Sequence, residues 1–295
     1  MAASKKDTNH GPLLIADIPW LLYRAFFSLP KSILGADGEP ANALLGTVNA
    51  LLTAVEACAP RAVVACFGAE QAAYRVQLYP PYHAHRDPMP AALAHQWEQA
   101  PALLASLGWI VDTSTELEAD DVMFSHALRE AHAGGRGLLL TGDRDLYQAV
   151  NERVAILELR KNEQPLELGP EEVRERYGIG PELVADFIAL RGDPSDGLPG
   201  APGVGAKTAC ELLLAYGSLE QVIENAREER PRIAAALRDN AEQLRAFKQI
   251  ATLVEIDVQR PGDRVTDFAG GARAAGELGM RRLAERLEQL ADAAR

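Results

Sequence analysis

Five short apolar runs mark the first half of the chain, and segments with helical spacing of apolar residues separate them. Such runs are typical of strands buried on both faces, and strands that alternate with helices form parallel sheets. The runs cover 13–16, 62–67, 109–111, 138–141 and 154–157, and the helical patterns cover 41–58, 91–107 and 118–132. The sequence therefore predicts an α/β fold, a parallel sheet flanked by helices.

Beyond about residue 165 the pattern becomes helical without strands. A stretch rich in Gly and Pro, 192–205, lies between a helix that opens at Pro181 and another that ends at Tyr216. We therefore predict an α/β domain over 11–165 and an all-helical domain over 166–295, after a disordered lead-in at 1–10. No apolar run is long enough to cross a membrane and no leader is recognisable, so we expect a cytoplasmic protein.

Acidic residues follow three of the predicted strands. The carboxyl ends of parallel strands meet at one edge of a sheet, where open α/β folds bind ligands. A fourth acidic group lies in the Gly/Pro-rich stretch. We expect these carboxylates to converge in one crevice: Asp17, Glu118, Asp120, Asp121, Asp143, Asp145, Asp193 and Asp196.

Carboxylates that converge without matching Lys or Arg repel one another unless a cation lies between them. Mg²⁺ and Mn²⁺ prefer oxygen ligands and meet that requirement. The alternative is that each acid caps a helix or interacts with a helix dipole. For a single residue such as Asp121 both interpretations stay open, but capping does not require four acidic groups at strand ends and glycine turns.

The motifs 142–145, 118–121 and 192–200 together resemble those of the bacterial 5′-nuclease, or flap endonuclease, family, which includes the 5′→3′ exonuclease domain of DNA polymerase I. The likeness extends from about residue 12 to about 260 and includes 23–26, Tyr82 and 199–209. The resemblance implies a Rossmann-like, PIN-like sheet and a helical domain with a helix–hairpin–helix at 181–216. With 295 residues there is no room for a polymerase domain, so the chain resembles the freestanding form.

The resemblance further implies a metal-dependent phosphodiesterase, a 5′→3′ exonuclease and flap endonuclease that acts on branched DNA in replication and repair. Two or three divalent cations, Mg²⁺ or Mn²⁺, would be held by the eight acids, and a K⁺ ion is a further candidate at the helix–hairpin–helix. Two-metal catalysis needs no covalent nucleophile. The residues expected to take part in catalysis are Asp120, Asp121, Asp143, Asp145, His83 and Arg86.

DNA contacts are expected on both sides of the acidic crevice. Glycines in the hairpin allow backbone N–H groups to approach a phosphate, and the next helix begins there. A tight helix–helix turn without DNA is the alternative. The residues expected to contact DNA are Tyr23, Arg24, Arg75, Arg86, Gly200, Gly203, Gly205, Lys207 and Thr208. We expect a monomer whose partner is DNA with a 5′ end.

The chain departs from the family at three places. Gly68 stands where the family usually has an acid, and His83 stands where it has a Lys. Imidazolium can replace that Lys only if phosphates raise its pKa, and an exposed histidine without a role is the alternative. Residues 18–20 replace small residues and remove a flexible turn. The segment 70–100 would form the arch through which a flap passes, and its four prolines predict an irregular arch.

Three other functions compete with the nuclease. A DNA-binding protein weakened in catalysis would keep the same pattern. A PIN-type ribonuclease would share the acidic crevice but not the hairpin at 197–209. A haloacid-dehalogenase-like phosphatase needs a second Asp two residues after its nucleophile, and Pro19 stands there.

The formal charge of −12 argues at first against a nucleic-acid binder. Without the charges of the eight crevice acids, the net charge of the chain would be −4. The acidity is therefore concentrated in the expected metal site, and we predict weak, salt-sensitive binding through Arg75, Arg86 and Lys207.

Overall fold

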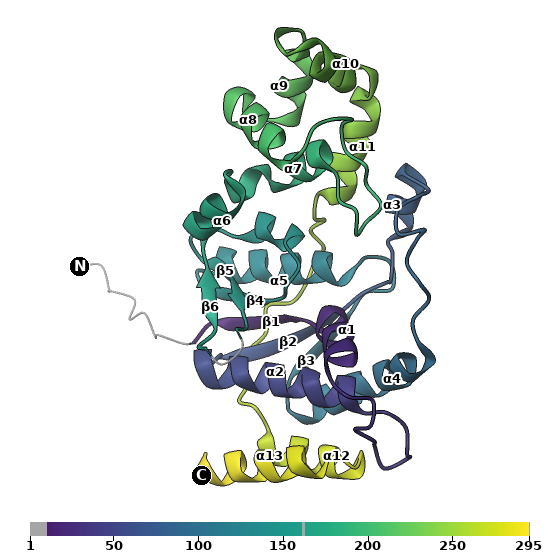
Figure 1. Cartoon of the computed structure of the whole chain (residues 1–295). Coiled ribbons are helices and arrows are strands. Elements are labelled where there is room, and N and C mark those ends of the chain that lie inside the picture. The colour runs from purple at the N-terminus through teal and green to yellow at the C-terminus, as the bar shows by residue number, and fades with distance from the viewer. Residues whose placement is uncertain (1–10, 161–162, 295) are drawn as a thin grey trace, which may run out of the picture.

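The computed structural model describes residues 11–160 and 163–294 (Figure 1). The lead-in predicted at 1–10 lies outside the described residues. Within them the chain forms one six-stranded sheet in the order β3-β2-β1-β4-β5-β6. The strands are β1 Leu13–Asp17, β2 Ala62–Phe67, β3 Ile110–Thr113, β4 Gly137–Leu140, β5 Val154–Glu158 and β6 Leu166–Leu168. The first five strands run parallel, as the apolar runs predict.

The prediction of no strands after residue 165 was wrong at one point. Strand β6 pairs antiparallel with β5 and extends the sheet. Its three residues alternate in exposure, with Glu167 exposed and Leu168 buried. An edge strand of this length leaves too few residues for a period-two pattern to stand out.

Helices cover both faces of the sheet, and strand β1 shows how its side chains divide between them. Leu13 and Ile15 belong to one apolar cluster, whereas Leu14 and Ala16 belong to the other. This alternation is the period of a strand buried on both faces. The helices of the α/β part are α1 Ile18–Ser28, α2 Asn42–Cys58, α3 Ala73–Leu78, α4 Ala91–Ser106 and α5 Ala119–His132.

A helical part continues from the sheet and stands above it in Figure 1. It contains the 3₁₀ turns Pro181–Leu183 and Ala226–Glu228. Helices α7 and α8 flank the Gly/Pro-rich stretch, where the sequence predicts a helix–hairpin–helix. The helices are α6 Pro170–Tyr177, α7 Val184–Arg191, α8 Ala206–Tyr216, α9 Leu219–Glu224, α10 Pro231–Asp239 and α11 Ala241–Ala251.

The chain then returns to the α/β part as an extended strap, residues 252–267. The backbone N–H of Arg264 donates to the carbonyl of Arg61 at 2.7 Å, and that of Asp267 donates to Leu107 at 2.8 Å. Helices α12 Phe268–Glu277 and α13 Arg281–Ala293 follow and join the apolar cluster of α2 and α4. Thus the last two helices pack on the α/β part, whereas the sequence assigned all of 166–295 to one helical domain.

The segment predicted to form an arch is irregular in its middle. Helix α3 covers one turn and a half, and turns without a helix occupy 79–90 before α4 begins. Among the described residues no helix combines the length and apolar character that a membrane crossing requires.

Candidate active site

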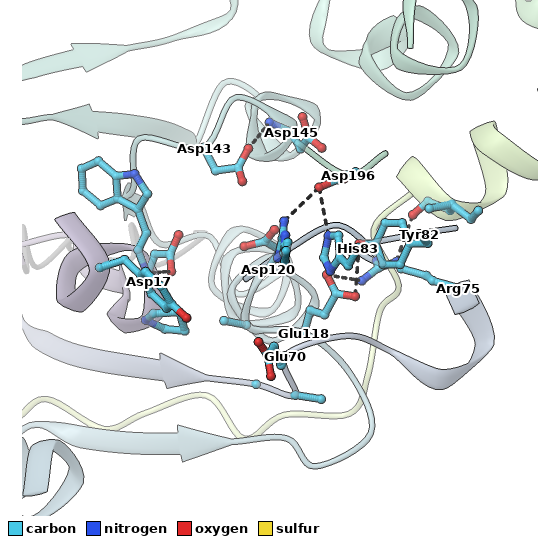
Figure 2. A pocket seen from close by; sticks show the side chains of 18 of the residues that line it. Asp17, Glu70, Arg75, Tyr82, His83, Glu118, Asp120, Asp143, Asp145 and Asp196 are labelled. Carbon is cyan, nitrogen blue, oxygen red and sulfur yellow. Dashed lines mark hydrogen bonds and ion pairs between the residues drawn. The ribbon is translucent and has the colours of Figure 1, made fainter. Parts of the chain in front are cut away.

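A pocket of about 480 Å³ lies beside the carboxyl edge of the sheet (Figure 2). Strands β1 and β4 are paired up to Ala16 and Leu140, so the residues that follow them emerge at the same edge. The pocket brings together six of the eight predicted acids. They are Asp17, Glu118, Asp120, Asp143, Asp145 and Asp196.

Asp17 is fixed by both its carboxylate oxygens. Its Oδ1 accepts from the N–H of Trp20 at 3.0 Å, which caps helix α1, and its Oδ2 accepts from the Thr141 hydroxyl at 2.8 Å. Helix α1 starts directly after Asp17, which confirms that no flexible turn follows it. Burial raises the pKa of Asp17 from its usual 3.8 to about 6. A cation near this carboxylate would therefore be favourable.

Thr141 also orients the next acidic pair, a role that the sequence did not suggest. Its Oγ1 accepts from the N–H of Asp143 at 3.0 Å. The Oδ1 of Asp143 accepts in turn from the N–H of Asp145 at 2.9 Å, at the start of the 3₁₀ turn Asp145–Ala149. Burial raises the pKa of both carboxyls, and at Asp145 the charge of Asp143 adds to the effect.

Asp120 lies in the first turn of α5 and faces the pocket. In the described part of the chain its carboxylate has no hydrogen bond or ion pair. Burial, followed by the charges of Asp143 and Asp17, raises its pKa well above the usual value. A half-buried carboxylate without a partner in the field of other acids fits a site for a divalent cation.

The donor chemistry of the pocket fits hard divalent cations, because every candidate ligand is a carboxylate. Figure 2 shows the side chains of Asp17, Asp120 and Asp143 around a common space. Over residues 11–160 and 163–294, however, no three His, Cys, Asp or Glu side chains lie close enough together to form a ready metal site.

Two predicted ligands lie outside the pocket. The Asp121 carboxylate is fully buried and accepts from Arg75 and from two backbone N–H groups. The Asp193 carboxylate accepts from the backbone N–H of Ser195 at 2.8 Å and from Arg191 at 3.1 Å. In this structure both acids interact with the protein itself and do not face the pocket.

Arg75 was expected to contact DNA, but its side chain is almost completely buried. The guanidinium pairs with Glu118 at 3.2 Å and with Asp121 at 2.8 Å. Its charge is therefore paired with two acids, although the residue still lines the pocket. A DNA contact of Arg75 stays a prediction.

His83 and Arg86 both lie against Asp196. The Nε2 of His83 is 3.0 Å from Asp196 Oδ1, and Arg86 Nη2 donates to the same oxygen at 3.1 Å. His83 is buried, with a positive φ of 57°, and its ring stacks on Tyr82. The alternative of an exposed histidine was therefore wrong. Arg86 is 43% exposed and lines the pocket.

Tyr82 and Glu70 line the pocket but were not among the predicted site residues. The Tyr82 hydroxyl donates to Glu118 Oε2 at 3.0 Å, and Glu118 Oε1 accepts from the N–H of Ala72 at 2.8 Å. Glu70 lines the pocket as an exposed acid. Only its place three residues after β2 could have indicated it.

Among the predicted DNA contacts, Tyr23 also lines the pocket, and the Arg24 guanidinium lies over the Trp20 ring at 5.3 Å. The hairpin is held together by two backbone hydrogen bonds of 2.8 Å between Asp193 and Leu198. Gly200 has a φ of +67°, and a Cβ there would lie 2.4 Å from the nitrogen of Gly192. Only glycine fits this close approach.

Beyond the hairpin, Gly203 has a φ of +82° and Gly205 precedes helix α8. Lys207 and Thr208 lie in the first turn of that helix. The Lys207 side chain is 89% exposed and lies 3.9 Å from Glu211. The arrangement places an exposed positive charge, paired only at long range with Glu211, beside a helix N-terminus.

Comparison with known proteins agrees with this geometry. Residues 12–178 match the family described as 5′-3′ exonuclease, N-terminal resolvase-like domain, and residues 179–265 match 5′-3′ exonuclease, C-terminal SAM fold. The chain belongs to the 5′-3′ exonuclease family. The two matched ranges meet between α6 and α7, so this family boundary falls after strand β6.

A 5′-3′ exonuclease of Mycobacterium tuberculosis is 33% identical over 92% of this chain and 93% of its own length. DNA polymerase I of the same organism is 36% identical over 86% of this chain, which spans only 28% of that polymerase. A solved structure of the bacteriophage T5 flap endonuclease, in complex with DNA and metal ions, has the same fold, with a TM-score of 0.68 at 16% sequence identity. The match covers 95% of the present 5′-3′ exonuclease family chain and 99% of the T5 chain.

Proposed function

We propose that the protein is a divalent-metal-dependent phosphodiesterase that cleaves DNA at 5′ ends and 5′ flaps. The observation that carries the proposal is the convergence of six carboxylates in one pocket. The exposed Arg86 lines the same pocket, and one of the six acids, Asp196, comes from the Gly/Pro-rich hairpin. The family membership and the names of the relatives support the same activity. The solved relative with metal ions and DNA supports both the cofactor and the substrate class.

The residues that would hold the cations are those that line the pocket: Asp17, Glu118, Asp120, Asp143, Asp145 and Asp196. A pair of divalent cations held there would supply activation of water, orientation of the phosphate and stabilisation of the leaving oxygen. Thr141 keeps Asp17 and the Asp143 loop in register. Mg²⁺ or Mn²⁺ is the proposed metal, because carboxylates suit both ions.

The DNA would be positioned from two sides. Arg86 lines the pocket and is partly exposed, so its guanidinium would contact the scissile phosphate. The hairpin and Lys207 would contact the backbone of the duplex, since such contacts position DNA without reading its sequence. A K⁺ ion at the hairpin, a monomeric state and a cytoplasmic location remain predictions from the sequence.

The test uses 5′-labelled flap substrates with Mg²⁺, Mn²⁺ or EDTA. We expect cleavage near the junction that requires a divalent cation and that is lost in Asp143→Asn, while binding of the flap persists. Binding without cleavage in the wild type would instead support a DNA-binding protein. Preference for an RNA flap of the same sequence would support a ribonuclease.

A further inference from the structure

We propose that Asp121 is a positioning residue which, with Arg75, fixes the helical part against the acidic end of α5. This inference rests on the proposed function of the pocket. It assigns to Asp121 a role different from that of its neighbour Asp120, although the two are adjacent in one acidic motif.

The contacts of Asp121 use both its carboxylate oxygens. Oδ1 accepts from Arg75 Nη2 and from the backbone N–H of Val254, each at 2.8 Å. Oδ2 accepts from the N–H of Glu118 at 3.3 Å, which completes a capping box at the start of α5. The residue is 0% exposed and does not line the pocket. A cation could reach this carboxylate only after these bonds broke.

Three segments that are distant in sequence meet at this carboxylate. Arg75 belongs to α3, Glu118 precedes α5, and Val254 belongs to the strap that follows α11. Arg75 strengthens the junction, because its Nε donates to the carbonyl of Ile250 in α11 at 3.0 Å. The Arg75 guanidinium also pairs with Glu118, so the junction includes a carboxylate of the pocket itself.

The junction continues into the helices that carry the hairpin. Lys248 of α11 pairs with the buried Asp186 of α7 at 2.8 Å, and Asp186 also accepts from the N–H of Leu219. On the other side Tyr79 packs edge-on against Phe247 of α11 at 5.0 Å. A continuous set of contacts thus joins the first turn of α5 to the helix–hairpin–helix.

Loss of the Asp121 charge would act on both ends of this junction. Arg75 would keep only Glu118 as an ionised partner, and the N–H of Val254 would lose a charged acceptor. Hydrogen bonds to charged groups are stronger than neutral ones, so the strap would be held less firmly. Duplex held by the hairpin would then be placed less accurately over the pocket.

The experiment compares Asp121→Asn with Asp120→Asn, which is matched in chemistry and adjacent in sequence. In metal-free protein we expect Asp121→Asn to accelerate hydrogen exchange at the Val254 amide by at least about tenfold. This corresponds to a decrease of about 1.4 kcal/mol in the free energy of local opening at this amide. Asp120→Asn should leave this exchange unchanged. With Mn²⁺, Asp121→Asn should retain the wild-type number of bound ions, and Asp120→Asn should bind fewer.

Flap cleavage provides the third measurement. We expect Asp121→Asn to raise the KM for flapped duplex more than it lowers kcat, whereas Asp120→Asn should lower kcat. If Asp121→Asn binds as few ions as Asp120→Asn, or if its Val254 exchange and its KM both equal those of the wild type, the positioning role is wrong.

If Asp121→Asn does not fold, Arg75→Lys supplies the same readouts, because it keeps the charge but loses the planar fork. Unaltered exchange at Val254 and unaltered KM in Arg75→Lys would overturn the proposal. If the wild type neither cleaves flaps nor binds Mn²⁺, the proposed function fails. The hydrogen-exchange comparison still decides the role of Asp121 in that case.

Discussion

Gly68 faces the backbone of Ala119 so closely that a Cβ on Gly68 would lie 2.1 Å from the Ala119 nitrogen. The same atom would lie 2.3 Å from the carbonyl carbon of Glu118. The N–H of Ala69 also donates to the carbonyl of Leu117 at 2.8 Å. The space that an acid at position 68 would need is therefore filled by the backbone that leads into α5.

We expect any side chain at this position to destabilise the protein. Gly68→Ala should lower the free energy of unfolding by at least about 1–3 kcal/mol, because the backbone of α5 has to move. Gly262→Ala is the matched control, since a Cβ there meets nothing within 4 Å. Urea unfolding of the two variants measures the difference. A Gly68→Asp variant that is as stable as the wild type and binds Mn²⁺ more tightly would contradict this expectation.

The strand-end acids illustrate how far the sequence could predict the site. Asp17 and Asp143 follow parallel strands, and parallel pairing brings their ends to one edge whatever the other residues are. The direction of Asp121 could not be predicted, because it depends on Arg75, 46 residues away, and on the strap at Val254. The spacing of residues within a motif does not determine how a helix is rotated about its axis, so it cannot tell which acid faces the pocket.

Arg75 and the C-terminal helices show the same limit. The sequence predicted a DNA contact at Arg75 but not its three protein partners, Ile250, Asp121 and Glu118. The return of α12 and α13 to the α/β part depends on the strap, whose contacts join residues far apart in the chain. These features depend on tertiary partners, while the strands and the longer helices follow from local periodicity.

A second prediction concerns Glu130, a buried acid at the far end of α5 from the pocket. Its carboxylate pairs with Arg61 at 2.5 Å and with Arg260 of the strap at 2.8 Å. Glu130→Gln leaves the buried Arg61 without its ionised partner on α5. We expect a loss of about 3 kcal/mol in the free energy of unfolding, measured with urea.

The control for Glu130 is Glu167→Gln, which breaks the exposed pair with Arg136. An exposed pair contributes less than about 1 kcal/mol, so this variant should unfold at nearly the wild-type urea concentration. Equal losses in the free energy of unfolding for the two variants would show that the contacts of Glu130 with Arg61 and Arg260 do not hold the strap in place.

A third prediction follows from the buried Asp17, whose pKa is about 6 instead of the usual 3.8. The folded state binds the proton more tightly than the unfolded chain, so this group stabilises the protein below about pH 4. That contribution is lost as pH rises to about 6. Without metal, the stability of Asp17→Asn relative to the wild type should therefore increase by up to about 3 kcal/mol over this interval.

Divalent cations should reverse the comparison. With Mg²⁺ above pH 6, the wild type keeps its ionised carboxylate beside a cation, and Asp17→Asn lacks that interaction. Thermal unfolding of both proteins in EDTA and in Mg²⁺ between pH 4 and 8 measures the effect. A relative stability that does not change with pH in EDTA would refute the prediction.

The last prediction concerns the salt dependence of DNA binding at the hairpin. Lys207 is 89% exposed at the start of α8, so it can contact a phosphate and release a counterion. Lys207→Ala should weaken the binding of flapped duplex and reduce the slope of log K against log salt by about one. Arg273→Ala is the control, because it removes one exposed cation from α12, which lies at the opposite end of the molecule from α8 (Figure 1). Fluorescence anisotropy at several salt concentrations measures both slopes, with EDTA present to prevent cleavage. Equal decreases in the two variants would mean that the overall charge, and not the hairpin, attracts the DNA.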